Sequence, residues 1–297
     1  MNIGFVGLGV MGFPMAGHLQ QAGHDVSVFN RSPEKAERWV AQYGGRSLPT
    51  PREAASGADL VCICVGNDDD VRSVVLGDDG VLAGLEPGAI LVDHTTASAS
   101  LARDLENRAG ASRVGFLDAP VSGGQAGAEN GVLTIMVGGR QEVFSRAEPV
   151  LQAYARCVKL LGPAGSGQLA KMVNQICIAG IVQGLAEALQ FSEQAGLDTA
   201  AVVEVIPRGA AQSWQMENRY QSMLAGEYDH GFAVDWMRKD LAMVLEEAQR
   251  MHLELPVTAM VDGYYEEVQA MGGGRWDTSS LFARMQAIGS GGSVHEC

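Results

Sequence analysis

Short apolar runs alternate with helix-length segments over the first half of the chain. The runs are rich in Val, Ile and Leu and are bounded by Gly, Asp, Asn or Pro, as is typical of strands in a buried parallel sheet. They lie at Ile3–Val6, Val26–Phe29, Leu60–Val65, Ile90–Val92, Gly115–Leu117, Leu133–Val137 and Val158–Leu161. Helical segments such as Met11–Ala22 and Pro33–Tyr43 lie between the first runs. This order predicts a doubly wound α/β sheet over residues 1–162.

The strand pattern disappears after Gly162. Gln168–Ala195 has apolar residues, among them Val173 and Ile181, near a helical period, which predicts one long helix. Four more helical segments follow, at Thr199–Pro207, Trp236–Met251, Val257–Met271 and Ser279–Ile288. We therefore predict an all-α domain over residues 163–288 and a disordered, glycine-rich tail over residues 289–297.

Composition and charge exclude several classes of protein. The chain has 297 residues, of which 46% are hydrophobic, so it can bury a substantial core. Its formal charge of −14 argues against a nucleic-acid partner. No uninterrupted apolar run reaches the ~20 residues that span a bilayer, and no basic leader precedes the first glycines, so we expect no membrane partner and a cytoplasmic location. The histidines and cysteines lack metal-ligand spacing, so we expect no metal site.

The first predicted strand leads into a glycine-rich turn. Its residues are Gly7, Leu8, Gly9, Val10, Met11 and Gly12. A GxGxxG sequence between a strand and a helix is typical of a dinucleotide-binding site. The first glycine permits the tight turn, the second lets the backbone approach a pyrophosphate, and the third lets helix and strand pack closely. The alternative is a glycine turn without a ligand, which the strand–turn–helix order disfavours.

The residues after the second predicted strand indicate which dinucleotide binds. NAD-binding sheets usually carry Asp or Glu there to hold the ribose 2′-hydroxyl. This chain has Asn30, Arg31 and Ser32 instead. No carboxylate repels a 2′-phosphate, the Arg31 guanidinium can bind one, and Asn30 and Ser32 can add hydrogen bonds. NADP is therefore favoured over NAD, with a solvated surface role for Arg31 as the alternative.

Two later segments carry polar residues suited to a small substrate. DAPVSGG (Asp118–Gly124) follows a predicted strand, and we expect Pro120 and the glycines to form a rigid turn. Ser122 and nearby N–H groups can bind a carboxylate there, and an ordinary glycine turn fits the spacing equally well. Lys171 and Asn174 share one face of the long helix. Burial of a lysine favours a role in proton transfer, whereas a surface lysine with a buried stem is the alternative.

Two acidic or mixed-charge segments are interpreted as solvated. The run Asp68–Asp70 is typical of a loop or a helix N-terminus in water. Lys239 and Asp240 are adjacent, and such a pair usually lies on the surface.

Together the motifs resemble those of the β-hydroxyacid dehydrogenases, which include 3-hydroxyisobutyrate dehydrogenase and tartronate semialdehyde reductase. The resemblance extends from Met1 to about Ile288. It rests on four motifs in order: GLGVMGFPMA (Gly7–Ala16), DAPVSGG, GPAGSGQLAKMVNQ (Gly162–Gln175) and Phe232–Asp240. It implies a Rossmann domain followed by a helical domain that builds a homodimer or homotetramer. It also implies hydride transfer between NADP(H) and a small β-hydroxy acid or its semialdehyde.

The resemblance further implies roles for individual residues. Lys171 would be the catalytic general acid and base. Ser122, Gly123 and Gly124 would anchor the substrate carboxylate, and Asn174 and Phe232 would contact the substrate. Thr96 would lie beside the nicotinamide, and Lys239 would help to close the site around the cofactor.

Two departures from the family pattern leave alternatives open. Many members have Asp at the position of Asn30 and use NAD, and typical 3-hydroxyisobutyrate enzymes have two asparagines where this chain has Asn174 and Gln175. The Asn-Gln pair resembles tartronate semialdehyde reductase more, and a succinic semialdehyde reductase is a further alternative. An imine reductase and a non-catalytic NADP-binding protein are also alternatives, but retention of Lys171 counts against both.

Overall fold

The computed structural model describes residues 1–289, so the predicted tail lies outside the described residues except for Gly289. The chain forms two compact units, which divide between Lys171 and Met172. The predicted domain boundary lies earlier, at Gly162, where strand β9 (Ala155–Gly162) ends. The division between the units falls inside the next helix, α9 (Ser166–Gln194). The first turn of α9 therefore belongs to the sheet-containing unit.

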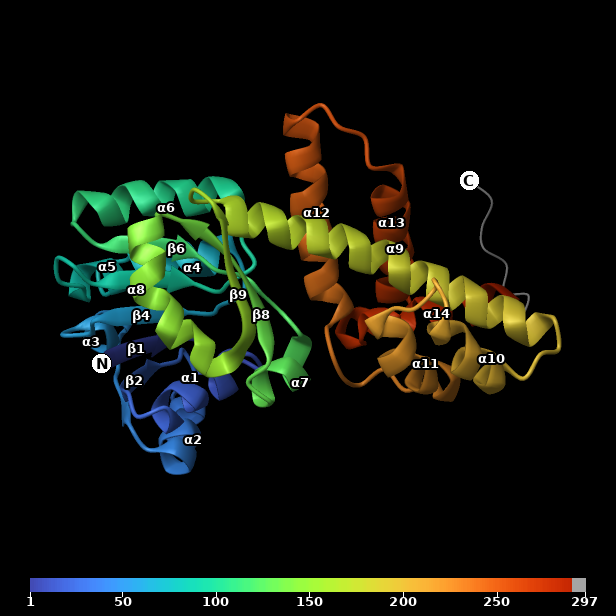
Figure 1. Cartoon of the computed structure of the whole chain (residues 1–297), viewed down its shortest axis with the longest axis horizontal. Coiled ribbons are helices and arrows are strands. Elements are labelled where there is room, and N and C mark those ends of the chain that lie inside the picture. The colour runs from blue at the N-terminus through green and yellow to red at the C-terminus, as the bar shows by residue number, and fades with distance from the viewer. Residues whose placement is uncertain (290–297) are drawn as a thin grey trace. The chain divides into compact units, whose positions relative to one another are not determined.

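The first unit is built on one sheet, as the alternating apolar runs predict (Figure 1). Its strand order is β3-β2-β1-β4-β5-β6-β8-β7, with β9 pairing β8. Besides β9, the strands are β1 (Asn2–Val6), β2 (Asp25–Phe29), β3 (Arg46–Ser47), β4 (Leu60–Ile63), β5 (Ile90–Asp93), β6 (Gly115–Asp118), β7 (Val121–Ser122) and β8 (Leu133–Gly139). The seven predicted strands are all present. The sequence missed β3 and β7 because two-residue strands carry no alternation pattern.

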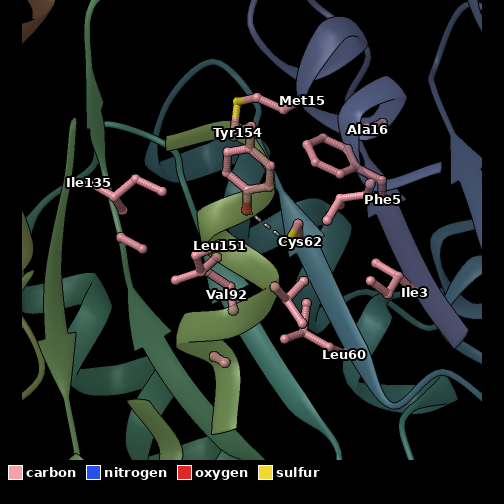
Figure 2. Close-up of a cluster of buried hydrophobic side chains, with 14 of the residues drawn as sticks. Ile3, Phe5, Met15, Ala16, Leu60, Cys62, Val92, Ile135, Leu151 and Tyr154 are labelled. Carbon is pink, nitrogen blue, oxygen red and sulfur yellow. Dashed lines mark hydrogen bonds between the residues drawn. The ribbon is translucent and has the colours of Figure 1, made fainter. Parts of the chain in front are cut away.

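Helices cover both faces of this sheet, which confirms the doubly wound fold. They are α1 (Gly12–Gln21), α2 (Pro33–Tyr43), α3 (Pro51–Ala55), α4 (Asp68–Leu76), α5 (Val81–Gly84), α6 (Ala99–Ala111), α7 (Gly124–Glu129) and α8 (Gln141–Leu151). One core packs α1, α2 and α8 against the sheet, and a second packs α3 to α6 against the other face. Figure 2 shows the first core, where the Tyr154 hydroxyl points toward Cys62 of β4, 3.7 Å from its sulfur.

The sheet is mixed, whereas the apolar runs predict a parallel one. β1, β2, β4, β5 and β6 are parallel, but β8 runs antiparallel to β6 and β7. The cause is the short connection around α7, which reverses the chain instead of crossing over the sheet. The predicted turn at Pro120 is also wrong. The Pro120 carbonyl accepts a hydrogen bond from Met136 N, so the chain continues along β8 and turns only at Gly123 and Gly124.

The second unit is helical over its described residues. After α9 come α10 (Thr199–Val205), α11 (Trp214–Ala225), α12 (Val234–Arg250), α13 (Pro256–Ala270) and α14 (Leu281–Gly289). Helices α12 and α13 lie side by side (Figure 1), joined by the Arg238–Asp262 ion pair at 3.1 Å. The sequence missed α11 because it buries only Met216 and Met223. Its start is fixed locally, since the Ser213 hydroxyl accepts a hydrogen bond from Met216 N.

Helix α9 is the longest element and contributes to the core of the second unit. Buried Val182, Leu185 and Leu189 pack there, whereas Val173 and Ile181, assigned to the apolar face by periodicity, are exposed. By length and composition α9 could cross a membrane, with a mean hydropathy of 1.4 over 18 residues, of which 44% are buried. A helix packed in a protein core passes the same test, and Leu185 and Leu189 of α9 lie in the core of the second unit.

Candidate active site

The glycine-rich turn lies where β1 ends, next to β4 at the point where the strand order reverses. Gly7 has a φ of +98°, and a Cβ there would overlap the Cys64 carbonyl. A Cβ at Gly12 would overlap the Gly7 carbonyl, so packing within the protein requires both glycines. Gly9 differs, because a Cβ there would meet no atom within 4 Å. The protein leaves this side of Gly9 open, as the approach of a ligand to the backbone requires.

The N-terminus of α1 suits an anion. Its N-cap residue, Met11, makes no side-chain capping bond, and its first turn contains no acidic residue. The first N–H groups of a helix lack partners within the helix and carry a partial positive charge. A dinucleotide pyrophosphate is the group that such a turn and helix start bind in doubly wound sheets.

Asn30 holds the glycine-rich turn against the end of β2. Its Oδ1 accepts a hydrogen bond from Leu8 N at 2.8 Å, and its Nδ2 donates to the Ser32 carbonyl at 3.0 Å. The sequence predicted hydrogen bonds from Asn30 to a cofactor phosphate. The structure instead gives this side chain two bonds within the protein, so Asn30 shapes the loop.

Arg31 is presented to solvent, with its side chain 90% exposed. One guanidinium nitrogen lies 3.6 Å from the Asp70 carboxylate in the first turn of α4. The run Asp68–Asp70 is a helix N-terminus, as predicted, but Asp68 also accepts bonds from Ser98 N at 2.8 Å and Ser98 Oγ at 2.5 Å. Asp70 therefore places a carboxylate beside the cation that is predicted to bind the 2′-phosphate.

Replacing Asp70 by asparagine is expected to lower the KM for NADP about 2–5-fold, the scale of one exposed ion pair. The change removes a negative charge from the neighbourhood of Arg31 and leaves an uncharged 2′-hydroxyl unaffected. Arg31→Ala is expected to raise the KM for NADP about 10-fold or more and to leave the KM for NAD unchanged. Initial rates at varied cofactor concentration measure both effects. Equal changes for NADP and NAD in either variant would contradict this role of the pair.

The loops after β4 and β5 are tied to each other just before Thr96. Asp93 ends β5 and is buried, and its Oδ1 accepts a hydrogen bond from Thr95 N at 2.8 Å. The Thr95 hydroxyl accepts a bond from Val65 N at 3.1 Å. Thr96, predicted to lie beside the nicotinamide, follows directly in a loop whose start is fixed by two buried side chains.

Asp93 makes the stability of the fold depend on pH. Burial raises the pKa of its carboxyl to about 7, and the Asp118 and Asp68 carboxylates add to the rise, while two bonds from Thr95 oppose it. Its ordinary value is 3.8. Between pH 3.8 and about 7 the unfolded chain therefore holds fewer protons, so this residue's contribution to stability falls as pH rises across that window.

Replacing Asp93 by asparagine is expected to remove this dependence, because the amide keeps an acceptor for Thr95 N–H but cannot ionise. The variant should match the wild type in free energy of unfolding near pH 4 and exceed it by about 2–4 kcal/mol at pH 8. Urea denaturation at several pH values gives the difference. A difference that stays constant with pH would show that Asp93 does not titrate in this window.

Asp118, the first residue of DAPVSGG, fixes the start of α9 to the sheet. Its two carboxylate oxygens accept bonds from Gly165 N at 2.8 Å and Gln168 N at 2.9 Å. A Cβ at Gly138 or Gly167 would overlap this carboxylate, which explains a glycine at both positions. Burial raises the pKa of the Asp118 carboxyl, and the backbone N–H donors lower it. The glycines of GPAGSG thus let a helix begin directly on the sheet.

The predicted carboxylate anchor follows at the end of β7. Ser122 pairs with Thr134 of β8, and Gly123 and Gly124 have φ values of +134° and +62°. This backbone favours glycine at both positions, most strongly at Gly123. A Cβ at Gly124 would meet no atom within 4 Å, so the turn is open to a ligand on that side.

Lys171 and Asn174 both lie in α9, as predicted, and Lys171 is buried with 7% of its surface exposed. In the second unit, Asn174 begins a chain of polar contacts. Its Nδ2 donates to Gln175 Oε1 at 2.8 Å, and Gln175 Nε2 donates to Asp240 Oδ2 at 2.6 Å. The other Asp240 oxygen lies 3.2 Å from Lys239 Nζ. Asp240 is 2% exposed, so the interpretation of Lys239-Asp240 as a solvated pair is wrong.

The backbone of Phe232 is fixed by a hydrogen bond. Its N–H donates to the buried Asp277 carboxylate at 2.8 Å, which also pairs with Arg219 at 3.2 Å. The sequence gave no signal for Asp277, because it lies 45 residues away along the chain. The roles predicted for Asn174, Phe232 and Lys239 remain predictions. Among the described residues, no group of three or more His, Cys, Asp or Glu is arranged to hold a metal ion.

Two family models cover the described chain. Residues 2–162 match the NAD-binding domain of 6-phosphogluconate dehydrogenase. Residues 165–285 match the NAD-binding region of NADP-dependent 3-hydroxyisobutyrate dehydrogenase. The first match alone spans more than half of the chain. The chain belongs to the β-hydroxyacid dehydrogenase family.

Known proteins agree with this assignment. An uncharacterized oxidoreductase of Shewanella frigidimarina is 63% identical over 96% of this chain and 98% of its own. The 2-hydroxy-3-oxopropionate reductase of Escherichia coli is 33% identical over 97% of this chain and 98% of its own. The structure of Mycobacterium tuberculosis 3-hydroxyisobutyrate dehydrogenase with L-serine is 30% identical, with a TM-score of 0.86 over 96% of this chain and 99% of that one.

The family assignment confirms the predicted class of protein. The family consists of NAD(P)-dependent oxidoreductases of the 3-hydroxyisobutyrate dehydrogenase type, and those matched members that are named for a reaction include dehydrogenases and reductases acting on hydroxyl groups or their oxidised forms. The two family models support NAD(P) as the cofactor of this β-hydroxyacid dehydrogenase family member.

Proposed function

We propose that this chain catalyses reversible hydride transfer between NADP(H) and a small β-hydroxy acid or its semialdehyde. One observation carries the proposal: a buried lysine, Lys171, lies in a helix whose start is fixed to the sheet by Asp118. A lysine held away from water in a helix that begins on a dinucleotide-binding sheet has the residue type and the surroundings for proton transfer.

The residues of the first unit fit the cofactor. The open side of Gly9, the uncapped start of α1 and the exposed Arg31 together suit a dinucleotide with a 2′-phosphate. When bound, NADP(H) would supply or accept the hydride. The absence of a carboxylate at position 30 and the cation at position 31 support NADP over NAD.

The chain's own side chains would orient the substrate and move the proton. Ser122 and the glycine turn after it would hold the substrate carboxylate, which positions the reacting carbon. The Lys171 amine would take the hydroxyl proton during oxidation and return it to the carbonyl oxygen during reduction.

The named relatives support a carboxylate substrate with an oxygen on the carbon beyond the α-carbon. 2-Hydroxy-3-oxopropionate and L-serine have three carbons, whereas 2-(hydroxymethyl)glutarate, for which a dehydrogenase of Eubacterium barkeri 34% identical to this chain is named, is a larger dicarboxylate. We infer that this chain acts on a carboxylate that carries a hydroxymethyl or aldehyde group. The Asn174-Gln175 pair, which departs from the double asparagine of 3-hydroxyisobutyrate enzymes, supports the 2-hydroxy-3-oxopropionate type.

The test is a set of initial rates of nicotinamide reduction on 3-hydroxyisobutyrate, glycerate, serine and 4-hydroxybutyrate, with NADP and NAD in parallel. Turnover of at least one acid with NADP preferred is the expected result. If no acid reacts while NADPH still binds, the proposed reaction is wrong. Imine reduction or a non-catalytic binding role would then take its place.

A further inference from the structure

Gln168 binds the loop that carries Thr96 from both sides of that residue. Its Oε1 accepts a hydrogen bond from Ala97 N at 3.0 Å, and its Nε2 donates to the Thr95 carbonyl at 2.8 Å. The side chain is 1% exposed, so water does not compete for these bonds. The Gln168 amide thus binds one backbone group before Thr96 and one after it.

The backbone of Gln168 is fixed as firmly as its side chain. Its N–H donates to Asp118 Oδ2 at 2.9 Å, in the first turn of α9. The residue is therefore held to the end of β6 through its backbone and to the loop after β5 through its side chain. Three positions further along the same helical face lies Lys171.

The rest of the Thr96 loop is fixed to other parts of the sheet. Thr95 is bound to Asp93 and to Val65 N, and Ser98 caps α6 while bonding to Asp68. These contacts set the loop relative to β4, β5 and α4. The contacts of Gln168 set it relative to α9, the helix that carries Lys171.

We propose that Gln168 is a positioning residue that fixes the loop carrying Thr96 at a set distance from Lys171. The proposal rests on the proposed function, in which Thr96 lies beside the nicotinamide and Lys171 transfers the proton. Hydride and proton transfer need Thr96 and Lys171 at fixed positions relative to the reacting atoms. A displacement of about 1 Å costs about 10²-fold in rate. Gln168 touches neither the hydride nor the proton and acts through the loop and the helix.

The test compares Gln168→Met with Gln183→Met. Methionine is close to glutamine in volume and lacks both the donor and the acceptor. Gln183 is also buried in α9, and its Nε2 donates to Glu187 at 2.8 Å, so its replacement controls for loss of a buried amide in the same helix. Gln168→Met is expected to lower kcat about 10–100-fold with a smaller change in the KM for NADP, whereas Gln183→Met retains wild-type kcat. Equal kcat values in the two variants would overturn the proposal.

Gln168→Glu supplies a readout that a purely structural role would not move. A protonated carboxyl has one donor and one acceptor, as the amide does, whereas the carboxylate has no donor for the Thr95 carbonyl. The ratio of its kcat to that of the wild type is expected to rise as pH falls. A ratio that is flat with pH contradicts the proposal, and this variant also serves if Gln168→Met does not fold.

Hydrogen exchange separates this inference from the proposed reaction. If the wild type turns over no β-hydroxy acid, the proposed function fails, but the Ala97 amide still reports on Gln168. Its exchange is expected to be about 10-fold faster in Gln168→Met than in the wild type and unchanged in Gln183→Met, because the Ala97 N–H loses its acceptor only in the first variant. Unchanged exchange at Ala97 in Gln168→Met would overturn the positioning role, whatever the reaction.

Discussion

Replacing Lys171 by alanine is expected to lower kcat by about 10²–10⁴-fold, the range that a positioned acid or base contributes. Lys171 is buried in α9, and neither its own segment, Gly162–Gln175, nor the earlier DAPVSGG segment contains another lysine. The binding of NADPH should be unchanged, because the glycine-rich turn and Arg31 do not depend on this amine. Stopped-flow or steady-state rates give kcat, and NADPH fluorescence gives the binding constant.

Lys159→Ala is the matched control, because Lys159 is an exposed lysine of β9 in the same unit. It should retain wild-type kcat. Lys171→Arg keeps the positive charge, but a guanidinium does not give up its proton near neutral pH. The kcat of this variant should therefore stay low. A Lys171→Ala enzyme with kcat within about threefold of the wild type would contradict the role of this lysine in proton transfer.

Replacing Asp118 by alanine is expected to lower the free energy of unfolding by about 3–5 kcal/mol. The carboxylate is buried and accepts the N–H groups of Gly165 and Gln168, and its loss leaves both donors without an acceptor inside the fold. The start of α9 should also loosen, so kcat should fall by more than stability alone explains at a temperature where the variant remains folded. Thermal or urea denaturation measures the first effect and initial rates the second.

Asp78→Ala controls for the loss of an aspartate, since Asp78 is exposed, and its effect on stability should lie within about 0.5 kcal/mol. Asp118→Asn keeps one acceptor oxygen and is expected to fall between the wild type and Asp118→Ala. A variant Asp118→Ala as stable as Asp78→Ala would show that this carboxylate does not hold the start of α9.

Most of the fold follows from local pattern. The seven predicted strands are present because each is a short apolar run bounded by turn residues, and the GxGxxG turn between a strand and a helix is a local signal of the same kind. The reversal of β8 was not predictable, because direction depends on the path of the chain and not on the composition of the strand. Helix α11 was missed for a related reason, as only two of its side chains are buried.

The residues that shape the site were harder to predict than those that match motifs. The side chains of Asn30, Asp118 and Gln168 each bond to a backbone group far along the chain, at separations of 22, 47 and 71 residues respectively, and sequence spacing carries no information on such pairs. The position of Asp118 after a buried strand was a usable signal, since ligands and loop contacts gather at that edge. Asp70 was interpreted only as part of the acidic run Asp68–Asp70. The sequence gave no indication that its carboxylate lies 3.6 Å from the Arg31 guanidinium.

The structure shows what glutamine contributes at position 175, where typical 3-hydroxyisobutyrate enzymes have a second asparagine. In an Asn-Gln pair, the longer side chain reaches Asp240 at 2.6 Å while its oxygen accepts from Asn174. An asparagine is one methylene shorter and would lose one of the two bonds. The orientation of the Asn174 amide is therefore set by Gln175 and Asp240, residues whose roles the motif alone did not reveal.

The most direct measurement follows the hydride itself. The chain is supplied with NADPH carrying deuterium at one face of C4 and then at the other, together with the semialdehyde of its best β-hydroxy acid. One of the two labelled forms is expected to place deuterium on the carbon that bears the new hydroxyl, as mass spectrometry of the product detects. Product without label from either form, or no product at all while NADPH binds, would contradict hydride transfer to a semialdehyde.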